Sequence, residues 1–249
     1  MAPLFDTVAE LYDEVRPSYP EQVFKLLKEK TGIAENSVVL EVGCGTGQAT
    51  RHLRLLSADL TCIDVGENML NINQQNHSDV NFIHSSFEEF ETVKKFDLIV
   101  SATSWHLMDE TTKYTKSYEL LKPNGFLAVL TNFHIERDPS AFHNRADYIY
   151  KKYLNSEGKN LSGEQKLDDQ RIEMENNLFN LSGEITIEWA QEYLISEYIQ
   201  LRRTYSDHLK LDNEERKNFE QELTSFANTN FNGVITKNYV TSLLIAKKL

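Results

Sequence analysis

Residues 38–47 read Val38-Val39-Leu40-Glu41-Val42-Gly43-Cys44-Gly45-Thr46-Gly47. The first five are apolar and mostly β-branched, interrupted only by a glutamate, which predicts a buried parallel strand. Glycines then occupy three alternate positions, and residues 48–56 have the apolar spacing of an amphipathic helix. A strand, a glycine-rich turn and a helix in this order predict the first unit of a nucleotide-binding α/β fold, because glycine lets the backbone approach a ligand closely.

The spacing of these glycines differs from that of a dinucleotide-binding loop. Such a loop reads G-x-G-x-x-G and binds a pyrophosphate, whereas this one reads E-x-G-x-G-x-G, with Glu41 two residues before Gly43. A carboxylate repels a phosphate and attracts a cation. The stretch resembles motif I of the class I S-adenosylmethionine-dependent methyltransferases, in which the loop wraps the cationic amino-acid half of the cofactor. The alternative is a glycine-rich turn without a ligand.

Composition limits the class of protein and of partner. A chain of 249 residues fits one α/β domain with an insertion, and 40% hydrophobic with 26% charged residues is typical of a soluble globular protein. The net charge of -12 disfavours nucleic acid and anionic membrane surfaces as partners. We therefore expect a small-molecule substrate, no nucleic-acid or membrane partner, and a monomer or homodimer.

Cysteines and histidines are few. Cys44 and Cys62 form no C-x-x-C pair, so we expect reduced thiols in a cytoplasmic protein. The acidic N-terminus does not resemble a signal peptide, and no apolar run is long enough for a transmembrane helix. The seven histidines are dispersed along the sequence, which predicts no metal site.

The N-terminal residues 1–30 predict two helices, at 4–15 and 19–30, with a capping box from Ser18 to Glu21. The segment between them resembles the Y-D-x-x-R-P-x-Y-P sequence of a small-molecule branch that includes trans-aconitate methyltransferase. In such relatives it folds over the cofactor as a lid. The resemblance implies cofactor contacts from Tyr12 and Arg16 and a substrate contact from Tyr19. A surface helix-turn-helix is the alternative.

The second and third predicted strands, 60–65 and 80–84, carry the expected nucleoside contacts. Asp64 ends the second strand, where an acid can accept both ribose hydroxyls or cap the next helix. Met69 could lie against adenine or in the core. Ser86 stands where the family commonly has an aspartate. The resemblance implies cofactor contacts from Tyr12, Arg16, Glu41, Gly43, Cys44, Gly45, Gly47, Asp64, Val65, Met69, Ser86, Phe87 and Ser101.

The fourth predicted strand, 96–101, is followed by Trp105 and His106, and it resembles motif IV of the family. Neither N-P-P-Y nor Pro-Cys, used by nucleic-acid methyltransferases, is present. Trp105 could wall the substrate pocket, face the sulfonium or only pack. His106 is the candidate general base, since its pKa is near neutral; it could instead only position the substrate or cap a helix.

The second half of the chain predicts the rest of a Rossmann-like, seven-stranded, mostly parallel sheet with helices on both faces. We expect strands at 126–131 and 184–189, an antiparallel last strand at 234–244, and a helical cap at 134–182, for which a disordered insertion is the alternative. The predicted helix 192–208 resembles the L-x-R-T-Y-S segment of the same branch. Arg203 or Tyr205 could reach the substrate from it, or Arg203 could form a surface salt bridge.

Together these features imply one domain, residues 1–249, that transfers a methyl group from S-adenosylmethionine to a small molecule. The reaction would be an in-line displacement, which depends mainly on alignment and on exclusion of water. Three alternatives remain: a non-catalytic module that binds the cofactor, a methyltransferase acting on protein or RNA, and a nicotinamide-dependent oxidoreductase, which the glycine spacing disfavours.

Overall fold

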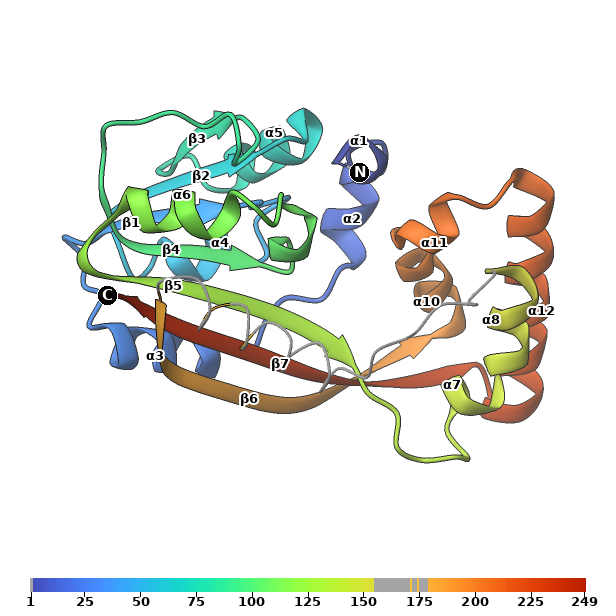
Figure 1. Cartoon of the computed structure of the whole chain (residues 1–249). Helices are drawn as coiled ribbons and strands as arrows, with labels where there is room; N and C mark the ends of the chain where they lie inside the picture. Colours follow the sequence, from blue (N-terminus) through green and yellow to red (C-terminus); the bar gives the residue numbers. More distant parts are fainter. Residues whose placement is uncertain (1, 155–170, 172–173, 175–178) are drawn as a thin grey trace.

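The computed structural model describes residues 2–154, 171, 174 and 179–249. Its centre is one seven-stranded sheet in the order β3-β2-β1-β4-β5-β7-β6 (Figure 1). All strands run parallel except β7, which lies antiparallel between β5 and β6. The predicted fold class is confirmed. The strands are β1 (Val38–Val42), β2 (Asp59–Asp64), β3 (Asn81–His84), β4 (Phe96–Ala102), β5 (Leu121–His134), β6 (Phe179–Leu194) and β7 (Val234–Lys248).

Alternate residues of the central strands fill two cores on opposite faces of the sheet, as the period of a strand requires. Val39 of β1 packs in one core with helix α3 (Glu21–Thr31), while Leu40 packs in the other with helix α6 (Lys113–Leu120). The remaining helices around this part are α4 (Thr50–Leu53), α5 (Glu67–Asn76) and the short 3-10 helix η1 (Trp105–Leu107). Central strands are therefore buried on both sides, whereas edge strand β6 alternates between partly buried and exposed residues.

A third core lies beyond one end of the long strands β5, β6 and β7 (Figure 1). Phe142, Tyr198 and Phe219 are among its buried side chains. It is built from helices α7 (Phe142–Arg145), α8 (Asp147–Tyr153), α10 (Ile195–Arg202), α11 (Ser206–Leu209) and α12 (Asn213–Phe231). The N-terminal helices α1 (Ala2–Asp6) and α2 (Ala9–Val15) lie between this helical part and the end of the sheet.

Several predicted boundaries are wrong for local reasons. The helix expected at 4–15 is broken into α1 and α2 by a turn at Thr7 and Val8. The capping box at Ser18 is absent, because Pro20 is the N-cap residue of α3 and the Ser18 hydroxyl donates to the Gln48 carbonyl.

Three further segments also differ from expectation. Residues 48–56 form only the short helix α4. The single helix expected at 192–208 is instead the end of β6 followed by α10 and α11. Strand β5 begins earlier than expected, at Leu121. Of the predicted cap, 134–182, residues 155–170, 172–173 and 175–178 lie outside the described residues. Among the helices that are described, none combines the length and apolar character needed to span a membrane.

Candidate functional site

The glycine loop turns sharply at the carboxyl end of β1. Gly43 and Gly45 have φ angles of 70° and 54°, a conformation that other residues rarely adopt. A Cβ on Gly43 would lie 2.4 Å from Ser104 Oγ, whereas one on Gly45 would meet nothing within 4 Å. The missing side chain of Gly43 therefore makes room for Ser104, whereas the space beside Gly45 is open and can accept a ligand.

Glu41 is buried directly beneath this loop. It is 1% exposed, and its Oε2 accepts hydrogen bonds from Thr50 Oγ1 at 2.6 Å and from Cys62 Sγ at 3.3 Å. Burial raises the pKa of Glu41 to about 7, against the lowering effect of these two bonds. A cation placed beside Glu41 would favour its ionised form.

Asp64 ends β2 beside the same loop. Its Oδ2 accepts from the Gly45 backbone N–H and its Oδ1 from the Gly66 N–H, both at 2.8 Å. Burial raises the pKa of Asp64. The start of α5 is capped by Asp6 of α1, whose Oδ1 accepts from Met69 N–H at 3.1 Å. Sequence reasoning missed Asp6, because this contact joins residues 63 positions apart.

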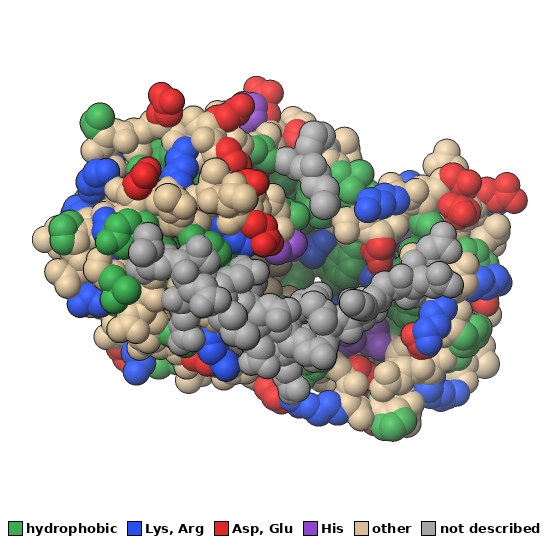
Figure 2. Space-filling view, in the orientation of Figure 1, with side chains coloured by type: hydrophobic (Ala, Val, Ile, Leu, Met, Phe, Trp, Pro, Cys, Tyr) green, Lys and Arg blue, Asp and Glu red, His purple; other side chains and the backbone are tan. Residues whose placement is uncertain are grey.

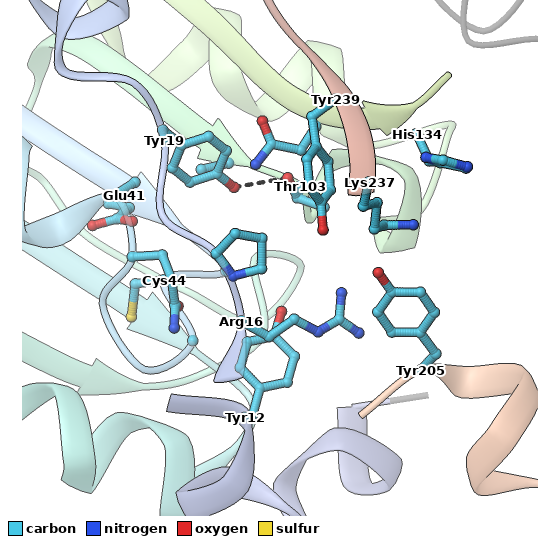
Figure 3. Close-up of a pocket in the computed structure, with 17 residues that line it drawn as sticks. Tyr12, Arg16, Tyr19, Glu41, Cys44, Thr103, His134, Tyr205, Lys237 and Tyr239 are labelled. Carbon is cyan, nitrogen blue, oxygen red and sulfur yellow. Dashed lines mark hydrogen bonds between the residues drawn. The ribbon is translucent and has the colours of Figure 1, made fainter. Parts of the chain in front are cut away.

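Two adjoining cavities open at this edge of the sheet, where Figure 2 shows a hollow between the sheet and the helical part. The larger, about 580 Å³, we call the nucleoside cavity, after the nucleoside contacts that the sequence predicts for Asp64 and Met69 in its lining. The smaller, about 270 Å³, we call the inner cavity (Figure 3). Predicted site residues lining the nucleoside cavity are Tyr12, Arg16, Gly43, Gly45, Asp64, Val65, Met69, Phe87, His106 and Tyr205. Those lining the inner cavity are Tyr12, Arg16, Tyr19, Glu41, Gly43, Cys44, Gly45 and Tyr205.

Five predicted site residues line neither cavity: Gly47, Ser86, Ser101, Trp105 and Arg203. Trp105 is 1% exposed and donates from Nε1 to Tyr114 Oη at 3.2 Å, so it packs in the core. Arg203 forms a surface ion pair with Glu220 at 2.7 Å.

The two serines among these five have local roles. The Ser86 hydroxyl accepts from the Glu89 N–H in a turn, and the neighbouring Ser85 lines the nucleoside cavity instead. The Ser101 hydroxyl is hydrogen-bonded to that of Ser104 at 2.7 Å, which fixes the side chain facing Gly43.

Arg16 connects the N-terminal helices to the helical part. Its Nη2 donates to the Thr204 carbonyl at 2.6 Å and its Nε to Thr204 Oγ1 at 2.8 Å. The guanidinium lies over the rings of Tyr12 and Tyr205, at 4.7 and 4.2 Å from their centroids. Arg16 thus joins the walls of both cavities by contacts to neutral groups.

Tyr19 reaches the inner cavity from the start of α3. Its hydroxyl is hydrogen-bonded to Thr103 Oγ1 at 2.7 Å (Figure 3). Thr103 has a φ of 59°, an unusual angle for a β-branched residue, at the carboxyl end of β4. Such strain is found preferentially at functional sites, and no sequence pattern indicated it.

Sequence reasoning also missed the residues that β5 and β7 contribute to the inner cavity: Asn132, His134, Lys237 and Tyr239. Lys237 is 4% exposed, and burial lowers its pKa. Within the described part of the chain, no aspartate or glutamate forms an ion pair with Lys237 or Arg16. A lysine inside the otherwise uncharged stretch 234–244 was the available signal.

The fold also brings together His134, Glu136 and His143, with one potential ligand atom of each within 4.8 Å of the others. The expectation of dispersed histidines overlooked these three residues, although they lie within ten positions of one another in the sequence. Burial is the main cause that lowers the pKa of His134, to about 3, and the charges of Lys237 and Arg202 lower it further. The same two cations oppose a bound metal ion, so the cluster carries no metal assignment.

Comparisons with known proteins identify methyltransferases as relatives of this chain. Residues 39–125 match the model of a methyltransferase domain. An uncharacterized methyltransferase of Schizosaccharomyces pombe is 27% identical over 130 residues, 51% of this chain and 52% of that protein. A malonyl-[acyl-carrier protein] O-methyltransferase of Halalkalibacterium halodurans is 31% identical over 144 residues, with the same coverage. The chain thus spans about half the length of the curated relatives it matches.

Solved structures resemble the whole chain in fold. A protein of Anaeromyxobacter dehalogenans assigned to the type II methyltransferases has a TM-score of 0.68 at 16% identity, covering 94% of this chain and 97% of its own. A phosphoethanolamine N-methyltransferase of Haemonchus contortus, solved with S-adenosylhomocysteine, has a TM-score of 0.55 at 15% identity and covers 98% of this chain and 57% of its own. At these identities the likeness concerns the fold alone.

Proposed function

We propose that this chain, which belongs to the class I S-adenosylmethionine-dependent methyltransferases, transfers a methyl group from its cofactor to a small-molecule acceptor. The observation that carries the proposal is the pair of adjoining cavities that meet at Gly43, Gly45 and Thr103. One cavity is suited to the cofactor, and the other is small and lies next to it. Such an arrangement favours direct transfer between two bound molecules.

The residues at the glycine loop fit the cofactor. Gly45 leaves open space where a side chain would project, and the buried Glu41 carboxyl can face a positive group. Asp64 lies at the nucleoside cavity with both oxygens already accepting backbone N–H bonds, which fixes its orientation. When bound, the cofactor supplies an activated methyl group on a positively charged sulfur. The chain's own part is to orient the acceptor and to exclude water.

The inner cavity supports a small acceptor with an anionic group. Its volume of about 270 Å³ is near the lower end for ligand pockets. Lys237 and Arg16 bring two positive charges to its lining without an ion-paired carboxylate among the described residues. A bound anion would relieve the unfavourable burial of the Lys237 charge and could also pair with the partly buried Arg16. Arg203, one of the two residues expected to reach the substrate, is engaged with Glu220 instead.

A direct test is to incubate the purified protein with S-adenosylmethionine and fractions of a soluble metabolite extract, and to measure S-adenosylhomocysteine by mass spectrometry. We expect product only with fractions containing small acids, together with a compound heavier by one methyl group. Asp64→Ala serves as the control with an impaired cofactor site. Preferential methylation of a folded protein or an RNA would contradict the proposed acceptor, and cofactor binding without any methylated product would support a non-catalytic role.

The N-terminal segment is proposed to close over the cofactor. In this structure it already contacts α5 through Asp6 and the helical part through Arg16, so closure would strengthen existing contacts. We expect amide hydrogen exchange of residues 4–20 to slow when S-adenosylhomocysteine is added, because bound ligand removes locally open states. The amides of α12, distant from both cavities, provide the internal control. Equal exchange with and without ligand would make this segment a static scaffold.

We also propose a cytoplasmic location. Cys44 and Cys62 are both buried free thiols near the cofactor site, which is typical of a reducing compartment. Fractionation of cells with an antibody against the chain would test it. Recovery of the protein outside the cytoplasmic fraction would contradict it.

A further inference from the structure

Tyr205 is surrounded by three cations. The guanidinium carbons of Arg16 and Arg202 lie over its ring, at 4.2 and 4.6 Å from the centroid, and Lys237 Nζ is 5.8 Å from the same point. The residue lies between α10 and α11 and lines both cavities. In Figure 3 its hydroxyl points into the inner cavity toward Lys237.

Only one of the three positive charges around the Tyr205 phenol is paired with a carboxylate among the described residues. Arg202 pairs with Asp207 at 2.8 Å, while Arg16 and Lys237 have no such partner among the described residues. The positive charges of the partly buried Arg16 and the buried Lys237 remain, and they attract any negative charge that forms between them. Burial alone would raise the pKa of Tyr205, but Lys237, Arg16 and Arg202 together lower it below its ordinary value, against a smaller opposing effect of Asp207.

The other tyrosines packed around Tyr205 behave in the opposite way. Burial raises the pKa values of Tyr150, Tyr193, Tyr198 and Tyr239, so these remain protonated neighbours. His134 lies across the same inner cavity, and its lowered pKa keeps it neutral near pH 7. Tyr205 is thus the tyrosine of this cluster on which the cations act most strongly.

We infer that Tyr205, rather than His106, is the general base that accepts the proton of a hydroxyl or amine acceptor during methyl transfer. This inference rests on the proposed function. Tyr205 lines both cavities, whereas the exposed His106 of helix η1 lines only the nucleoside cavity. A general base must lie within reach of the proton that it removes from the acceptor. The position of Tyr205 in the inner cavity therefore favours it over His106.

The proton and electron balance of the step is simple. A lone pair of the acceptor oxygen or nitrogen forms the new bond to the methyl carbon, and the methyl–sulfur bond pair stays on sulfur. The acceptor proton passes to the Tyr205 phenolate oxygen. Arg16 and Lys237 stabilise the phenolate before transfer, and one positive charge remains available for an anionic group of the acceptor.

The first test needs no acceptor. The chain has 11 tyrosines, and phenolate formation can be followed by near-ultraviolet absorbance as pH is raised. We expect one tyrosine of the wild type to ionise clearly before the others, below the ordinary value of about 10. Tyr205→Phe should remove this early step, Lys237→Met should move it to higher pH, and Tyr239→Phe should keep it. Indistinguishable titrations of wild type and Tyr205→Phe would overturn the inference.

The second test uses the acceptor found in the extract assay. We expect Tyr205→Phe to lower turnover by roughly 10²–10⁴-fold and to abolish the acid limb of the pH profile, with S-adenosylhomocysteine affinity retained by calorimetry. His106→Ala should keep the acid limb. Loss of that limb in His106→Ala, or its presence in Tyr205→Phe, would overturn the assignment. So would an acceptor methylated on an ionised carboxylate at unchanged rate in Tyr205→Phe. Failure to find any acceptor would count against the proposed function. The titration would still test whether Tyr205 ionises before the other tyrosines.

Discussion

Gly43→Ala is expected to lower the free energy of unfolding by about 2–5 kcal/mol and to abolish detectable binding of S-adenosylhomocysteine. The new Cβ would lie 2.4 Å from Ser104 Oγ and 2.5 Å from Ser104 Cβ. Ser104 cannot easily move away, because its hydroxyl donates to the Val42 carbonyl at 2.8 Å and contacts Ser101 Oγ at 2.7 Å. The expected loss of about 2–5 kcal/mol combines roughly 1–2 kcal/mol for a left-handed φ with roughly 1–3 kcal/mol for overpacking.

Gly45→Ala is the matched variant that separates folding from binding. Its φ of 54° carries a similar backbone cost, but its Cβ would meet nothing within 4 Å in the protein. We expect a loss of only about 1–2 kcal/mol in stability with at least a tenfold loss of affinity, because the methyl group projects into the ligand space. Urea unfolding and calorimetry measure the two quantities. Gly45→Ala binding as tightly as wild type would remove the glycine loop from the cofactor site.

Glu41→Gln is expected to stabilise the ligand-free protein at pH 8 while weakening the cofactor site. Burial raises the pKa of Glu41 in the folded state to about 7, above its ordinary value. Folding therefore favours the protonated form. The stability that the folded protein has with Glu41 protonated is fully present below the unfolded pKa of about 4.3. It is lost as pH rises through about 7, where the buried carboxyl ionises. Glutamine keeps the group neutral at every pH.

The size of this effect follows from the shift. At pH 8 the ionised wild type is less stable than its protonated form by roughly 3 kcal/mol, so we expect Glu41→Gln to gain about 1–3 kcal/mol at pH 8 and little at pH 4. S-adenosylhomocysteine, which keeps the ammonium group, should bind more weakly by roughly 1–3 kcal/mol. Denaturant unfolding at both pH values and calorimetry test this. A variant less stable than wild type at pH 8, with affinity intact, would show that Glu41 is only structural.

The sequence was most informative where chemistry depends on neighbouring residues. The glycine loop, Glu41 and Asp64 lie within 27 positions of one another, and local rules for strands, turns and glycine fixed their arrangement. A seven-stranded, mostly parallel sheet with an antiparallel last strand followed from the same pattern together with the resemblance to a family. These parts of the fold are confirmed.

The inner cavity could not be predicted, because it depends on pairing between distant strands. His134 of β5 lies opposite Tyr239 of β7 in an antiparallel register, which also brings Lys237 to that edge. No local pattern specifies which residues of β5 and β7 become partners. Burial of Lys237 follows only from this pairing.

The sequence also could not predict which of two neighbouring side chains on a short helix is buried. Arg202 is 6% exposed and faces Tyr205, while the neighbouring Arg203 pairs with Glu220 on the surface. Trp105 is in the core, and the next residue, His106, is exposed at a cavity. A shift of one residue rotates a side chain by about 100° on a helix, so uncertain helix boundaries left these orientations undetermined.

The central claim is that S-adenosylmethionine binds at the carboxyl edge of β1 and β2, and calorimetric titration with S-adenosylhomocysteine tests it most directly. We expect saturable one-to-one binding to the wild type. Asp64→Ala should bind more weakly by roughly 1–3 kcal/mol, because the variant leaves the Gly45 and Gly66 N–H groups and the ligand's hydroxyls without their acceptor. Arg203→Ala, altered at a surface pair outside both cavities, should bind like the wild type. No binding to the wild type, or equal affinity in Asp64→Ala, would contradict the claim.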